Sequence, residues 1–160
     1  MKTRLALTLA GAAFATLALA GCSTAGTSRS APSPSAAAAA DAAVSITTLG
    51  TVVVDGKGMT AYFFDKDTAN SGSSACTGSC EANWPAITSA SATPKVSGIT
   101  GTVGTITGVA GGRQLTINGR PIYTYALDKA PGSTNGQGVL GVWYVISPSG
   151  DEIKSAASRY

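Results

Sequence analysis

The 160-residue sequence contains no histidine, and only 12% of its residues are charged. Without histidine, the chain cannot form a Ser-His-Asp triad, a histidine metal site or a histidine-ligated haem. Its 11 cations and 8 anions are scattered, with no basic run. Because nucleic-acid binding needs a clustered basic surface, we expect no nucleic-acid partner. Carboxylates, tyrosines and cysteines are the side chains left for chemistry.

No apolar run has the roughly 20 residues needed to cross a bilayer, but residues 5–20 come close. This run follows two cations and ends in Leu19-Ala20-Gly21-Cys22. A charged start, a short apolar stretch and small final residues are typical of a secretory signal peptide. The last four residues resemble the lipobox of bacterial lipoproteins, whose cysteine thiol takes a diacylglycerol. An ordinary signal peptide with a chance cysteine is the alternative.

We therefore predict a lipoprotein signal peptide over residues 1–21 and a lipidated Cys22 at the mature N-terminus. Two or three acyl chains, palmitate among them, would hold the protein stably on the outer face of the cell membrane. Residues 22–43 are rich in Ser, Ala and Pro and lack bulky apolar side chains. We interpret them as a disordered tether that carries a folded domain over residues 44–160.

That domain is predicted to be mainly β, because its sequence is rich in Thr, Val, Ile and Tyr with frequent turn residues. The clearest hairpin signal is Asn118-Gly119, between residues 113–117 and 120–125. A second hairpin is expected around residues 55–58. Further strands are expected over 102–109 and 139–146, and one helical turn near 80–84. We expect antiparallel strands in one compact sandwich or barrel.

An internal repeat divides the domain into two pseudo-symmetric halves, at about residues 50–90 and 112–150. Each half contains a glycine turn, a tyrosine, a second aromatic residue two positions later and an aspartate five positions after the tyrosine. A tryptophan follows after a loop. The paired residues are Tyr62 and Tyr123, Asp67 and Asp128, and Trp84 and Trp143.

These features resemble the bacterial "secreted repeat" lipoproteins with a Tyr-x4-Asp motif, a family of unknown function. The resemblance covers roughly residues 50–150. Ala61 departs from it, since the family usually has leucine there. The resemblance implies no cofactor and no reaction, and it favours an actinobacteria-like host. The stretches that carry it are Tyr62 to Asp67, Cys76 to Cys80 with Trp84-Pro85, Gly119 to Asp128, and Pro131 to Gly138 with Trp143-Tyr144.

With Cys22 lipidated, Cys76 and Cys80 remain as an even pair outside the cytoplasm, where a disulfide is expected. Redox exchange and metal binding are the alternatives. A thioredoxin-type pair has two intervening residues rather than three, and a zinc site lacks further ligands.

The motif residues have two interpretations. Asp67 and Asp128 could each accept backbone N–H bonds and fix a turn, while Tyr62 and Tyr123 pack with their hydroxyls in water. Alternatively, the four side chains line one shared ligand site.

The tryptophans also have two interpretations. Trp84 and Trp143 could be core anchors, or they could form an exposed stacking platform for sugars of the cell wall. The glycine-rich segment 128–138 lacks the lysine-serine ending of a phosphate-binding loop, and we interpret it as a long connecting loop.

Two classes of function follow. The first is a surface-anchored structural or ligand-binding module of the cell envelope, with no catalytic residue, metal or cofactor, acting as a monomer on a cell-wall or small-molecule ligand. The second is an extracytoplasmic redox or electron-transfer accessory, or a carboxylate-based enzyme. Acid/base catalysis needs two carboxyl groups with different pKa values, whereas aspartates at equivalent positions of two repeats have similar surroundings. This argues against the enzyme.

Overall fold

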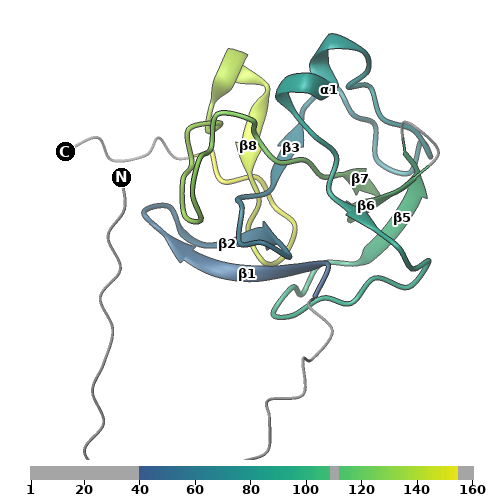
Figure 1. Cartoon of the computed structure of the whole chain (residues 1–160), viewed down its shortest axis with the longest axis horizontal. Coiled ribbons are helices and arrows are strands. Elements are labelled where there is room, and N and C mark those ends of the chain that lie inside the picture. Colours follow the sequence, from purple (N-terminus) through teal and green to yellow (C-terminus); the bar gives the residue numbers. More distant parts are fainter. Residues whose placement is uncertain (1–39, 109–111, 155–160) are drawn as a thin grey trace, which may run out of the picture. The chain divides into compact units, whose positions relative to one another are not determined.

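The computed structural model describes residues 40–108 and 112–154 (Figure 1). The predicted signal peptide, Cys22 and most of the predicted tether lie outside the described residues. In the described part of the chain, no helix is both long and apolar enough to span a membrane. The strands are antiparallel and form separate sheets, which confirms the mainly β class.

The first sheet is a hairpin of β1 (Ala42–Thr47) and β2 (Gly50–Asp55), drawn as the long ribbon at the bottom of Figure 1. The folded domain therefore begins earlier than residue 44, the start expected from composition. Ala42 is fully buried, and the Asp41 carboxylate accepts hydrogen bonds from the Ser89 hydroxyl and the Lys95 amide. The start of this strand was not expected because it lies in an alanine-rich segment, whose small side chains give only a weak hydrophobic pattern.

The hairpin expected at Asn118-Gly119 is confirmed. It joins β6 (Arg113–Ile117) to β7 (Arg120–Pro121), and both turn residues have positive φ, 51° and 76°. β6 is central in its sheet, with β5 (Val103–Thr107) and β4 (Thr88–Ser89) on its sides. The strand expected over 102–109 is the shorter β5, since residues 102 and 108 are not in the strand and residue 109 is outside the described residues.

The hairpin turn expected around residues 55–58 is present, since the Asp55 amide donates to Met59 O at 2.8 Å and the Ala61 amide donates to Val53 O at 2.9 Å. Thr60 bridges back to Val54, but the paired segment is short, because β3 (Tyr62–Phe64) pairs with β8 (Trp143–Val145). All three β3 residues are buried. The expected strand 139–146 is also shorter, because its first part is a 3-10 turn, η2 (Val139–Gly141).

The two repeats have matching hydrogen bonds. The Asp65 amide donates to Val142 O at 2.8 Å, and the equivalent Ala126 amide donates to Asn83 O at 2.8 Å. At the centre, Tyr62 and Tyr123 exchange backbone bonds of 2.8 and 3.0 Å. The predicted helical turn is α1 (Ser79–Asn83), which Trp84-Pro85 follows and which corresponds to η2 in the second repeat. The two repeats thus meet along the strands that carry the motif tyrosines.

Candidate functional site

The Tyr-x4-Asp motifs pair across the two repeats. The Tyr62 hydroxyl donates to Asp128 Oδ2 at 2.6 Å, and the Tyr123 hydroxyl donates to Asp67 Oδ2 at 2.7 Å. The crossing follows from topology, because Tyr62 and Tyr123 lie on adjacent strand segments that run in opposite directions. Each aspartate follows its strand and therefore reaches the tyrosine of the other repeat.

The second carboxylate oxygen of each aspartate fixes a loop. Asp67 Oδ1 accepts the Ala75 amide at 2.7 Å, and Asp128 Oδ1 accepts the Asn135 amide at 2.9 Å and its side-chain amide at 3.1 Å. These contacts match the turn-fixing interpretation of the aspartates. The expectation that the tyrosine hydroxyls reach water is wrong, because Tyr62 and Tyr123 are buried.

Burial also sets the ionisation of this network. Burial, together with the hydrogen bond to Asp128, raises the pKa of Tyr62 well above its ordinary value. Burial likewise raises the pKa of Tyr123. Burial raises the pKa of Asp67 against the opposing effect of its two hydrogen bonds. The tyrosines are therefore neutral proton donors over the physiological range.

The tryptophans form a stack of four rings. The Trp84 and Trp143 rings lie parallel, with centroids 3.7 Å apart and planes at 2°. Phe64 stacks on the outer face of Trp143 at 4.2 Å, and Tyr125 stacks on Trp84 at 4.2 Å. Trp84 is 5% and Trp143 2% exposed. The structure therefore places both tryptophans as core anchors, and their ring faces are not available as a platform for sugars.

Tyr62 and Tyr123 join this stack at its sides. Tyr62 meets Trp84 edge-on at 5.4 Å, and Tyr123 meets Trp143 edge-on at 5.3 Å. The structure thus brings all six motif side chains, two tyrosines, two aspartates and two tryptophans, into one buried cluster. The tyrosine hydroxyls and the aspartate carboxylates of this cluster are engaged in hydrogen bonds.

Cys76 and Cys80 form the expected disulfide, with Cα atoms 5.3 Å apart. Cys76 is fully buried in the same core cluster as Tyr62 and Trp84. Among the described residues, no three acidic or cysteine side chains gather into a set that could hold a metal ion.

Sequence reasoning missed the role of Arg120. Its guanidinium lies 4.3 Å from the Phe63 ring, donates to Phe64 O at 3.0 Å and pairs with Asp65 and Glu152. It therefore ties the second repeat to the first and to the C-terminal segment. The only sequence signal was its place directly after the Asn118-Gly119 turn.

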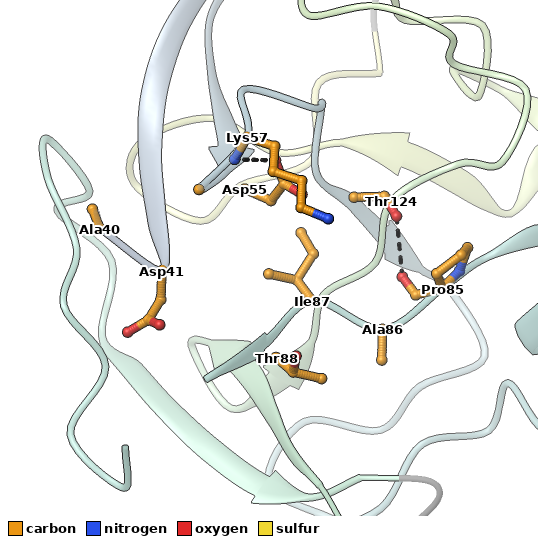
Figure 2. Close-up of a pocket in the computed structure, with 10 residues that line it drawn as sticks. Ala40, Asp41, Asp55, Lys57, Pro85, Ala86, Ile87, Thr88 and Thr124 are labelled. Carbon is orange, nitrogen blue, oxygen red and sulfur yellow. Dashed lines mark hydrogen bonds between the residues drawn. The ribbon is translucent and has the colours of Figure 1, made fainter. Parts of the chain in front are cut away.

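A hollow of about 450 Å³ lies away from the motif cluster (Figure 2). Ile87, 4% exposed, contributes an apolar surface, and Lys57 extends above it in Figure 2. The Lys57 ammonium has no ion-pair or hydrogen-bond partner among the described residues, although its backbone amide donates to Asp55 Oδ1 at 2.9 Å. The remaining lining residues are Ala40, Asp41, Gly56, Pro85, Ala86, Thr88 and Thr124.

A second hollow, a groove of about 310 Å³, opens onto the edges of the stacked indoles. Trp84, Trp143, Phe64 and Cys80 line it, with Leu140 at its side. Leu140 is 87% exposed and has a φ of 53°. The sequence patterns predicted neither hollow, because each combines segments that are far apart in the chain.

A comparison with family models gives two matches to a family described as a secreted repeat of unknown function, over residues 43–88 and 104–147. Each match contains one tyrosine, one aspartate and one tryptophan of the buried cluster. No curated protein and no solved structure matches the chain. The two matches together span more than half of the chain and coincide with the two structural repeats, so the protein belongs to this family of secreted repeats.

Proposed function

We propose that this protein is a lipid-anchored binding module of the cell envelope, without catalytic activity of its own. The observation that carries the proposal is the complete use of the motif side chains in contacts between the repeats. Because the motif side chains hold the two repeats together, a ligand would have to bind to other residues at the surface. The lipobox-like Leu19-Ala20-Gly21-Cys22 supports anchoring on the outer face of the cell membrane.

The hollow of Figure 2 is the best candidate for the ligand site. Lys57 offers an unpaired ammonium, while Asp41 and Asp55 each have one carboxylate oxygen without a partner among the described residues. Thr88 and Thr124 add hydroxyl groups beside the apolar Ile87. Such a lining suits a small polar ligand with charges of both signs, such as a peptide or amino-sugar fragment of the cell wall.

The chemistry of the described residues favours binding over catalysis. Asp67 and Asp128 each accept at least two hydrogen bonds and are buried, so neither carboxylate is open to a substrate. The chain also has no histidine to serve as a general base near neutral pH.

The ligand site is tested by thermal-shift measurements with peptide and amino-sugar fragments of peptidoglycan. We expect one fragment class to raise the Tm of the wild-type protein, and Lys57→Met to abolish that rise. Lys129→Met is the matched control, because it removes an exposed ammonium outside the hollow. An equal Tm rise in Lys57→Met, or no rise with any fragment, would contradict this assignment.

The anchor is tested in the full-length protein by fractionation of cells. We expect the wild-type chain in the membrane fraction, with an intact mass that shows cleavage before Cys22 and added diacylglycerol. Cys22→Ala should lose the lipid and leave the membrane fraction. Recovery of an unmodified wild-type chain would refute the anchor and leave the ligand assignment to be judged by the thermal-shift result.

A further inference from the structure

The aromatic cluster forms a continuous path of rings through the core. Phe64, Trp143, Trp84 and Tyr125 stack in that order, with centroid separations of 4.2, 3.7 and 4.2 Å. Core aromatic pairs commonly prefer offset or edge-on arrangements, whereas the two indoles here lie almost parallel at close range. A positive charge created on one indole would therefore be shared by both.

Each indole also has its own tyrosine with a proton acceptor in place. Tyr62 lies edge-on to Trp84 and is bonded to Asp128 at 2.6 Å, while Tyr123 lies edge-on to Trp143 and is bonded to Asp67. A phenol loses an electron readily only when its proton leaves at the same time. A carboxylate already in a short, charge-assisted hydrogen bond can accept that proton without any rearrangement.

A groove gives small molecules access to this path. The groove of about 310 Å³ is lined by Trp84 and Trp143 and opens to the surface. A small oxidant in the groove would contact the indole edges, while the two tyrosine hydroxyls stay buried behind them. The groove, the indole pair and the tyrosines thus lie in the order needed for stepwise electron transfer.

We propose that this protein is a one-electron relay, in which an outer-sphere or radical oxidant in the groove takes one electron from the Trp84–Trp143 pair. The tyrosine in edge contact then gives an electron to the indole radical cation, and its phenolic proton passes to the carboxylate that it already contacts. The products are the oxidant reduced by one electron, the restored indole, a neutral tyrosyl radical and a protonated aspartate. A thiolate donor reverses the step by returning one electron, while the proton goes back from the carboxyl group.

Pulse radiolysis of the full chain with the azide radical, which oxidises indoles and is reduced to azide, tests this relay. We expect the indole radical signal to decay as a tyrosyl radical appears, at a rate that is independent of protein concentration and slower in D₂O. Both the independence from protein concentration and the slowing in D₂O can be measured on the wild-type protein. A rate proportional to protein concentration, an absent tyrosyl signal or no slowing in D₂O would each overturn the proposal.

Variants identify the residues that take part. Tyr62→Phe/Tyr123→Phe should lose the tyrosyl phase, and Asp67→Asn/Asp128→Asn should slow it by about a hundredfold, because a positioned base is missing. Tyr144→Phe is the control, since the Tyr144 hydroxyl donates to Gly141 O and its ring is outside the stack. Retention of the phase in a folded double phenylalanine variant, or its loss in Tyr144→Phe, would assign the radical elsewhere and refute the relay.

Discussion

The first repeat (residues 43–88) and the second repeat (residues 104–147) have the same order of elements, yet neither contains its own core. Each motif tyrosine is bonded to the aspartate of the other repeat. Phe64 of the first repeat stacks on Trp143 of the second, and Tyr125 of the second stacks on Trp84 of the first. The comparison indicates that the two repeats are interlocked halves of one folding unit.

The repeats differ at their periphery. The loop after Asp67 contains the disulfide, whereas the loop after Asp128 is held by the side chain of Asn135. Just before the motif aspartate, Lys66 of the first repeat corresponds to an exposed leucine, Leu127. Three residues before the tryptophan, Glu81 corresponds to Leu140. The residues that both repeats share form the buried core, whereas the residues that differ between the repeats lie at the surface.

The largest effects should come from the tryptophans, where the two repeats meet. We expect Trp84→Ala and Trp143→Ala each to lower the free energy of unfolding by about 3–5 kcal/mol, because each removes a buried ring with three aromatic neighbours. Urea unfolding measures both losses, and Tyr144→Ala is the control outside the stack. If one variant lost less than half as much free energy of unfolding as the other, the two tryptophans would not be equivalent in the two repeats.

The sequence revealed the repeat because its signals are local and periodic. The Asn118-Gly119 turn needs positive φ at both positions, so two residues predict that hairpin. The short spacing of Cys76 and Cys80 likewise predicts their disulfide. The tyrosines, aspartates and tryptophans could be recognised as equivalent from spacing alone.

The partners across the repeats could not be predicted in this way. Nothing local distinguishes a β3 strand paired with β2 from one paired with β8, because the choice depends on how much surface the distant partner buries. The bonds between Tyr62 and Asp128 and between Tyr123 and Asp67 join residues 66 and 56 positions apart. The site was therefore predicted as a set of residues, and its pairing required the structure.

A double-mutant cycle tests the crossed pairing directly. We expect Tyr62→Phe and Asp128→Asn to be coupled by about 1.5–3 kcal/mol, the range for hydrogen bonds to charged groups. Tyr62→Phe combined with Asp67→Asn, its neighbour in sequence, should be additive to within about 0.5 kcal/mol. Urea denaturation of the wild type and of the single and double variants supplies the unfolding free energies for both combinations. If Tyr62→Phe were coupled to Asp67→Asn and not to Asp128→Asn, the motif would stabilise a turn within its own repeat instead of joining the two repeats.

The disulfide sharpens the difference between the two loops. Cys76→Ala/Cys80→Ala should lower the free energy of unfolding by about 2 kcal/mol, since a loop this small restricts the unfolded chain only modestly. Asn135→Ala tests the corresponding lock in the second repeat and should cost about 1–3 kcal/mol, because it leaves Asp128 with one acceptor oxygen less well satisfied. Thermal unfolding under oxidising and reducing conditions checks both. A reductant should destabilise the wild-type chain and leave the double alanine variant unchanged.

The smallest effect concerns Leu140, which has a φ of 53° and an almost fully exposed side chain. A left-handed backbone costs a leucine roughly 1–2 kcal/mol, whereas asparagine adopts it more readily. Because little packing is lost at an exposed position, we expect Leu140→Asn to raise the free energy of unfolding by about 0.5–1 kcal/mol. The equivalent exchange in the first repeat, Glu81→Asn, is the control, since Glu81 lies in α1 and has helical backbone geometry. Stabilisation of Leu140→Asn without stabilisation of Glu81→Asn would place the strain in the second repeat. A destabilised Leu140→Asn variant would instead mean that the leucine contributes packing beside the indole groove that outweighs its backbone strain.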